Sequence, residues 1–308
     1  MLANFFKKSK PVNTFALVIL LYVYYLLSTF LLNTQSLSFV LILKHLGFFI
    51  WLVIALLIIE FIIKKNKLTA QNSYGILIAI FVLGMFSKAM FTSEVVFANL
   101  ALLLSFRKIY SLKSDLSIKQ KLFDAGFWIG VATLFFAWSW LFIALIYVAI
   151  FSFKKLDFRN AIIPLIGFII PLFLTFTYFI IVNDTTSFYN IIELNLSLDF
   201  TSYNSLNLLV PITFIIGIVL WSVFGLLPKI NNAGKGKIKV WYVALFQLLF
   251  ATILVIISPI KNGAEIFFII FPIAIFVANF IQLSKSEVFK NMILYLFLII
   301  SLTTYFIA

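Results

Sequence analysis

The chain has 308 residues, of which 64% are hydrophobic and only 11% are charged, with a net charge of +13 and no cysteine. Soluble domains contain about 45–50% apolar and about 25% charged residues, so this composition excludes a water-soluble fold. The lack of cysteine excludes disulfides and thiolate metal sites. Basic residues occur in short runs between apolar stretches, which is typical of topology signals and anionic-lipid contacts, so nucleic acid is not an expected partner.

Apolar stretches of about 17 to 25 residues can cross a bilayer as helices, because a helix satisfies its own backbone hydrogen bonds in lipid. The first stretch is longer than a signal-peptide core and lacks a small-residue cleavage site, so we expect it to be retained. We therefore predict an all-α, polytopic transmembrane helix bundle that forms a single integral membrane domain, 1–308. The predicted spans are 14–32, 39–63, 74–91, 93–106, 161–182, 207–227, 240–257, 264–283 and 288–307, with the region 125–153 in addition.

The distribution of Lys and Arg predicts the orientation. All but three of the 23 basic residues fall in six runs, which begin at Lys7, Lys64, Arg107, Lys154, Lys229 and Lys285. Basic loops are retained in the cytoplasm, so the N-terminus is expected inside and the C-terminus outside. The three remaining basic residues, Lys44, Lys88 and Lys261, then fall on the outer side.

The region 125–153 lies between two basic runs that should both be cytoplasmic, so a single crossing would break the alternation. We predict a short-helix hairpin here, with its turn near Trp138-Ser139-Trp140, which makes about 11 helical segments in all. Backbone that turns at membrane depth must be covered by protein or line a cavity, so the hairpin is a candidate wall of an internal site. The alternative is that Trp138 and Trp140 are only interfacial anchors.

Charged side chains near the hydrocarbon are costly, so each needs a partner or a task. Glu60 stands four residues before Lys64, which is the spacing of a helical ion pair, and we expect a structural role for it. Lys261 and Glu265 have the same spacing.

Acidic residues gather on the predicted outer side, where Asp184, Glu193 and Asp199 share one loop that has no Lys or Arg. One interpretation is a catalytic site made of Glu94 with Glu193 and Asp199. A carboxylate there would act as a general base or hold a divalent cation near a lipid-linked phosphate. The other interpretation is that these acids only solvate a loop that the charge bias leaves free of lysine.

Four basic or titratable residues are candidates for contacts with such a lipid phosphate, namely Lys44, His45, Lys88 and Arg107. His45 is the only histidine, and a lone histidine beside a lysine at a helix end is more often a side chain that reaches toward the interface. The chain contains no H-E-x-x-H, G-x-S-x-G, P-loop or dinucleotide-binding glycine pattern, so no cofactor is predicted.

Two stretches carry a resemblance to a known family. They are Phe97–Leu112, which reads FANLALLLSFRKIYSL, and Lys121–Phe136, which reads KLFDAGFWIGVATLFF; the opening Phe6–Asn13, FKKSKPVN, is similar as well. They resemble a family of uncharacterised multi-spanning inner-membrane proteins of Bacteroidota. The resemblance implies a bacterial cytoplasmic (inner) membrane location and carries no established activity.

The basic loop, the hairpin and the span that follows also resemble, more distantly, the core of polyprenyl-phosphate-dependent membrane glycosyltransferases. Those enzymes usually have an acidic residue in the first outer loop, where this chain reads Asn33-Thr-Gln-Ser-Leu-Ser. Glu94 is then the nearest substitute. The resemblance implies a function in cell-envelope glycan or lipid-linked precursor metabolism, either as a lipid-linked sugar transferase or as an accessory, with a polyprenyl phosphate as ligand.

Two hypotheses from other classes stay open. A carrier or flippase for an amphiphile would need polar residues along a path across the bilayer, and the candidates are Asn99, Gln247, Asn279 and Gln282. Hydrogen bonds between packed helices explain the same residues. The third hypothesis is a non-catalytic subunit of a membrane complex, whose partners would be other membrane subunits and lipids.

Overall fold

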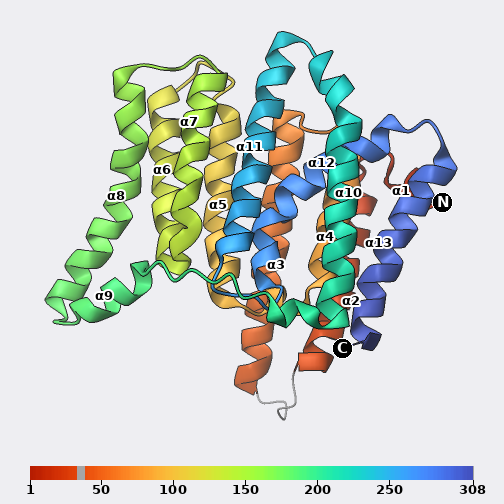
Figure 1. The fold of residues 1–308 in the computed structure, drawn as a ribbon, viewed down its shortest axis with the longest axis horizontal. Coiled ribbons are helices and arrows are strands. Elements are labelled where there is room, and N and C mark those ends of the chain that lie inside the picture. The colour runs from red at the N-terminus through yellow and green to blue at the C-terminus, as the bar shows by residue number, and fades with distance from the viewer. Residues whose placement is uncertain (33–38, 308) are drawn as a thin grey trace. The chain divides into compact units, whose positions relative to one another are not determined.

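The computed structural model of the chain describes residues 1–32 and 39–307, and within those ranges it is helical with no strand (Figure 1). The predicted outer loop at 33–38 therefore lies outside the described residues. The α-helices are α1 (Leu2–Phe6), α2 (Pro11–Leu32), α3 (Phe39–Asn66), α4 (Tyr74–Met85), α5 (Ser93–Ser111), α6 (Ile118–Phe135), α7 (Ile143–Ser152), α8 (Phe158–Ile181), α9 (Thr185–Ile192), α10 (Leu206–Asn231), α11 (Lys235–Ile257), α12 (Ile270–Leu283) and α13 (Glu287–Ile307). Four 3-10 helices are η1 (Ser87–Met90), η2 (Ala137–Phe142), η3 (Thr201–Asn204) and η4 (Ala264–Ile269).

Seven helical segments in the described part of the chain are long and apolar enough to cross a membrane. They are Pro11–Phe30, Phe39–Asn66, Phe158–Ile181, Leu206–Asn231, Gly236–Ile257, Ala264–Leu283 and Glu287–Ile307. The prediction of an all-α fold is thereby confirmed for the described residues, and the seven segments support the prediction of a membrane protein. The number of about 11 segments and the orientation stay predictions.

The region 125–153 contains two helices rather than one. Helix α6 ends at Phe135, Phe136 is extended with φ −146° and ψ 103°, and η2 joins it to α7. Helices α6 and α7 contact each other. Helix α6 begins at Ile118, earlier than the predicted start. Its first turns are polar and make contacts with the preceding segment, since the Lys121 ammonium donates to the carbonyl of Ser111 at 2.8 Å.

The chain divides into two compact units. Unit 1 comprises residues 1–92, 199–229 and 260–308, and unit 2 comprises residues 93–198 and 230–259. Each unit has its own packed helices, and each is described below by itself. The division groups residues by their contacts, and it does not test the prediction of a single integral membrane domain.

Helices α4 and α12 form the core of unit 1. Every residue of α4 is buried, and α4 contacts α2, α3, α12 and α13. A helix that is apolar on all sides must be surrounded by other helices, so α4 lies in the interior of this unit. On the neighbouring α3, Glu60 and Lys64 form the predicted ion pair.

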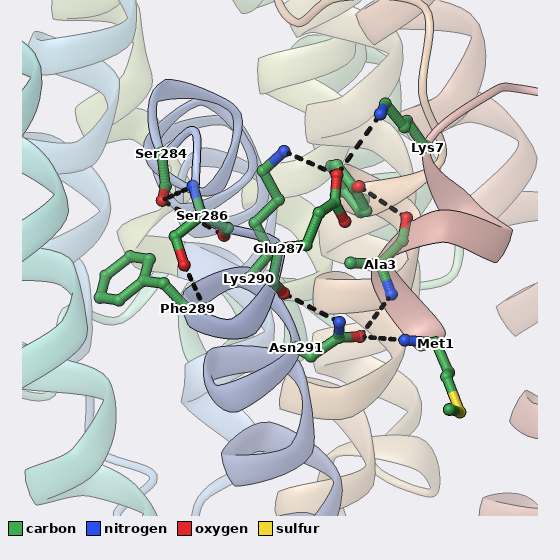
Figure 2. Close-up of polar contacts among 10 residues, drawn as sticks. Met1, Ala3, Lys7, Ser284, Ser286, Glu287, Phe289, Lys290 and Asn291 are labelled. Carbon is green, nitrogen blue, oxygen red and sulfur yellow. Dashed lines mark hydrogen bonds and ion pairs between the residues drawn. The ribbon is translucent and has the colours of Figure 1, made fainter.

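Helix α1 and the first turns of α13 meet at one end of unit 1, as Figure 2 shows. The Asn291 side-chain oxygen accepts hydrogen bonds from the backbone nitrogens of Met1 at 2.8 Å and Ala3 at 3.0 Å. The Glu287 carboxylate lies 3.4 Å from the Lys7 ammonium and 3.5 Å from that of Lys290 (Figure 2). Two predicted cytoplasmic basic runs therefore share this end of the unit.

Close packing of α6 against α8 organises unit 2. A Cβ atom on Gly126 would lie 2.0 Å from the carbonyl oxygen of Pro164, and one on Gly167 would lie 2.3 Å from the carbonyl oxygen of Phe123. Small residues allow helix backbones to approach this closely in membrane proteins. On the other side of α6, the Ser105 hydroxyl donates to the carbonyl of Ala125 at 2.9 Å.

Ion pairs hold two basic runs of unit 2, and one of them, Lys155–Asp115, joins the two runs. Lys108 pairs with Asp124 at 2.6 Å, and Lys155 pairs with Asp115. The runs that begin at Arg107 and Lys154 therefore share one end of this unit, as their common predicted side requires.

Candidate functional site

A cavity of about 300 Å³ lies at the end of unit 1 where α4 and α13 terminate. It is opposite the contacts of Figure 2, because those involve the first turns of α13 whereas Thr304 and Tyr305 in its last turns line the cavity. The lining residues are Met85, Phe86, Ser87, Lys88, Ser202, Ser205, Asn207, Leu208, Asn262, Thr304 and Tyr305.

The lining combines apolar and polar side chains. Phe86, Leu208 and Tyr305 supply apolar surface, while hydroxyl and amide groups come from η1, from η3 and the residue after it, and from the start of α10. The Asn207 side-chain oxygen is buried and has no hydrogen-bond partner in the described part of the chain. A buried acceptor without a partner costs free energy, so a ligand with a donor group would be stabilised there.

A buried polar cluster holds η3 against the start of η4, next to the cavity. Glu265 has no solvent-accessible surface, and its carboxylate accepts hydrogen bonds from the Tyr203 hydroxyl and from the Gly263 backbone nitrogen, the latter at 3.0 Å. The Lys261 ammonium lies 4.8 Å from the centroid of the Phe200 ring. These contacts fix the segment from which Ser202 and Ser205 reach the cavity.

Gly263 is required for this arrangement. Its φ of +93° lies in the left-handed region, which L side chains rarely adopt. A Cβ atom would also lie 2.9 Å from the Phe86 side chain and 3.0 Å from that of Leu208. Glycine therefore allows the chain to turn between Lys261 and Glu265 without filling the cavity wall.

Burial shifts the pKa of two groups in the cluster. It lowers the pKa of the Lys261 ammonium below its usual value, while the negative charge of Glu265 acts in the opposite direction. Burial also raises the pKa of the Tyr203 phenol, and Glu265 raises it further. Tyr203 is thus a protonated donor to Glu265 at every physiological pH.

The three predicted catalytic acids are distributed over both units. Glu94 is exposed in the first turn of α5, and exposed Glu193 follows the last residue of α9, both in unit 2. Asp199 belongs to unit 1, where it accepts a hydrogen bond from the Thr201 backbone nitrogen at 2.9 Å that lowers the pKa of its carboxyl. No group of three or more His, Asp or Glu side chains suited to a metal ion occurs among the described residues.

The four predicted phosphate contacts also have different surroundings. Lys88 lines the cavity of unit 1. Exposed Lys44 precedes His45, whose ring nitrogen lies 3.0 Å from the Tyr25 hydroxyl and whose ring meets that of Phe91. Arg107 is half-buried on α5 in unit 2, beside the Lys108–Asp124 ion pair in the sequence.

The small polar residues of the cavity were not predicted from the sequence, which pointed instead to charged residues and to Asn99, Gln247, Asn279 and Gln282. The signal was present in the run Thr201-Ser-Tyr-Asn-Ser and in the pair Asn262-Gly263, which interrupt the apolar pattern on the predicted outer side. Glu265 was interpreted only as an ion-pair partner. Its burial depends on the contact with Tyr203, 62 positions away, which spacing does not reveal.

Three of the four residues considered for a carrier path make hydrogen bonds within the described structure. Gln247 accepts a hydrogen bond from Tyr110 at 2.6 Å, and Asn279 donates to the carbonyls of Leu68 and Ile275 at 2.8 and 2.9 Å. Gln282 accepts from the backbone nitrogen of Ala70 at 3.2 Å. The Tyr110–Gln247 bond joins α5 to α11, as the helix-packing alternative expects, whereas Leu68 and Ala70 lie between α3 and α4.

Comparison with known proteins adds the family to this description. No curated protein and no solved structure matches the chain. One family model, described as "Family of unknown function (DUF6427)", matches residues 1–308. The chain has seven segments that could cross a membrane and an amphiphilic cavity in unit 1. Over its whole length it belongs to the family of unknown function DUF6427.

Proposed function

We propose that this membrane protein binds the phosphate-bearing headgroup of a lipid-linked precursor in the cavity of unit 1, and so acts in cell-envelope glycan or lipid-linked precursor metabolism. The observation that carries the proposal is the composition of the cavity wall. A lysine, serines and asparagines line it together with the apolar side chains of Phe86 and Leu208. Hydroxyl, amide and ammonium groups donate hydrogen bonds to phosphate oxygens, and apolar side chains accommodate an aliphatic chain.

The cavity supports binding better than catalysis. Among the residues that line it in the described structure there is no Asp, Glu or His, so it offers no general base of the usual kind. We therefore favour an accessory that presents or retains a lipid-linked phosphate. A lipid-linked sugar transferase remains the second form of the proposal, and it would need Glu94, Glu193 or Asp199 as the acid.

The proposed location is the bacterial cytoplasmic membrane, with the N-terminus inside. The charge bias supports this orientation, because Lys7 and Lys290, which belong to two of the basic runs (Figure 2), lie at the end of unit 1 opposite the cavity. Lys88 and Lys261, two of the three basic residues outside those runs, lie at or next to the cavity end. The headgroup would then be held at the outer surface.

Replacing Lys88 with glutamine should weaken binding of a polyprenyl phosphate by about tenfold, because one charge-assisted hydrogen bond contributes about 1.4 kcal/mol. The measurement is a titration of the purified full chain in detergent, followed by native mass spectrometry. Lys8→Gln makes the same change of charge at an exposed residue that does not line the cavity, and it should bind as the unmodified chain does.

Two further ligands make this test specific. A polyprenol without phosphate should bind more weakly than the phosphate and should be insensitive to Lys88→Gln. Inorganic phosphate should compete poorly, since it gains nothing from the apolar wall. Equal affinity for the alcohol and the phosphate, or unchanged binding by Lys88→Gln, would rule out the proposed headgroup site.

The enzymatic form makes a separate prediction about the three acids. If it is correct, at least one of Glu94→Gln, Glu193→Gln and Asp199→Asn should abolish complementation of a null strain, measured by growth and by envelope glycan analysis. All three residues are exposed, so folding should be unaffected. Full complementation by every variant would eliminate the transferase and leave the accessory.

A further inference from the structure

Helix α9 and the segment after it form an apolar surface at one end of unit 2. Helix α8 ends at Ile181, and Asn183 adopts a left-handed conformation with φ 59°, so the chain turns sharply into α9 (Figure 1). Asp184 caps the new helix by accepting bonds from the Ser187 backbone nitrogen at 3.3 Å and the Thr186 hydroxyl at 2.9 Å. The turn and the cap set the direction of α9.

Aromatic packing holds α9 against α8. Phe188 is buried, and its ring lies 5.0 Å from that of Phe176 and 6.4 Å from that of Phe179, between centroids. Tyr189, the next residue, is 58% exposed. The helix therefore buries one side against the unit and presents aromatic surface on another.

The following residues, 193–198, have no regular secondary structure, and a leucine occupies every second position. Leu194, Leu196 and Leu198 are 48%, 56% and 60% exposed. Glu193 begins the segment in an extended conformation, with φ −63° and ψ 128°, and continuing that conformation would place the three leucines on one face and Asn195 and Ser197 on the other. Exposure of three neighbouring leucines to water is unfavourable, so this surface is expected to be covered by lipid or by protein.

Backbone contacts place this segment at the level where the apolar helices of unit 2 end. The Trp138 indole nitrogen donates to the carbonyl of Asn195 at 2.8 Å, and the Ser197 backbone nitrogen donates to the carbonyl of Ile257 at 3.3 Å. Ile257 is the last residue of the span-forming helix α11. The apolar surface also continues onto the end of α8, where Ile181 is 74% exposed.

We infer that residues 185–198 form a membrane-interface element, in which α9 and the three leucines insert into the boundary between lipid headgroups and acyl chains. Tryptophan and tyrosine, here Trp138 and Tyr189, are typical of that depth. The chain has no Lys or Arg between Arg159 and Lys229, so insertion is driven by burial of apolar surface and not by attraction to anionic lipid. This inference is independent of the proposed headgroup cavity, which belongs to unit 1.

The test uses the absence of cysteine from the chain, which allows single nitroxide labels without background. Leu194→Cys, Leu196→Cys and Leu198→Cys are labelled in the full chain, reconstituted into phosphatidylcholine vesicles, with Asn195→Cys as the matched control. Collision rates with oxygen, which enriches in lipid, and with a water-soluble nickel chelate are measured by electron paramagnetic resonance. Ile169→Cys on the exposed face of α8 is the lipid reference, and Lys8→Cys is the water reference.

The expected ratio of oxygen to nickel collisions is about twofold or more higher at the three leucine positions than at Asn195, and it should not change when anionic lipid is added. Leucine labels that behave as Lys8 does would show that the segment lies in water. Labels protected from both reagents would show that protein, such as a second copy of the chain, covers the surface. Either of these two results would overturn the inference.

Discussion

Gly126→Ala is expected to destabilise unit 2 by about 3 kcal/mol, near the upper end for an added methyl group in a packed interior. The new Cβ atom would lie 2.0 Å from the Pro164 carbonyl oxygen and 2.8 Å from its carbonyl carbon. Both are backbone atoms, which cannot move aside as a flexible side chain can. Helix α8 would have to shift away from α6, and the measurement is the midpoint of unfolding of the purified protein in mixed detergent micelles.

Gly217→Ala provides the control. Gly217 lies within α10, and a Cβ atom there would meet no other atom within 4 Å. Alanine is favoured over glycine inside a helix by about 1 kcal/mol, so this variant should be as stable as the unmodified chain or slightly more stable. Equal stabilities of the Gly126 and Gly217 variants would show that α6 and α8 do not pack as closely as described.

Glu265→Ala is expected to lower the free energy of unfolding by about 3 kcal/mol, because it removes a buried carboxylate that accepts two hydrogen bonds. The Tyr203 hydroxyl and the Gly263 backbone nitrogen would lose their acceptor at the same time. The same unfolding measurement applies. Glu193→Gln, which changes an exposed acid, should have little effect.

Two further variants distinguish the contributions to this cluster. Glu265→Gln keeps an oxygen that accepts the bond from Tyr203, so it should cost less than Glu265→Ala. Tyr203→Phe removes one hydrogen bond to a buried charged group and should cost about 1.5–3 kcal/mol. A Glu265→Ala protein as stable as the unmodified chain would contradict the cluster, since a buried carboxylate with two donors cannot be lost without cost.

Much of the helical architecture was predictable because it depends on local properties of the chain. Apolar length predicted the long helices, and i,i+4 spacing predicted the Glu60–Lys64 pair. Helix α4 was predicted to reach residue 91, but it ends at Met85, where Phe86 leaves the helical conformation and η1 begins. Hydropathy does not distinguish an α-helix from an apolar 3-10 turn, so it cannot locate such an end.

Of the candidate site, Lys88 was predicted, and its neighbours in the cavity were not. Charge alone drew attention to Lys88, because a lysine away from the basic runs is costly near lipid. The Glu94, Glu193 and Asp199 site remains a prediction that experiments on those residues must decide. The serines and asparagines of the cavity belong to no motif in the sequence, and only the tertiary structure shows that they line one cavity.

The sequence by itself determined that this is a helical membrane protein, because hydrophobic length and the distribution of lysine are properties of the linear chain. Tertiary structure alone decided which side chains meet. Tyr203 and Glu265 are 62 positions apart, and Met85 and Thr304 line one cavity from opposite halves of the chain. Such contacts depend on close helix packing. At Gly126, for example, one added methyl group would overlap the Pro164 carbonyl oxygen.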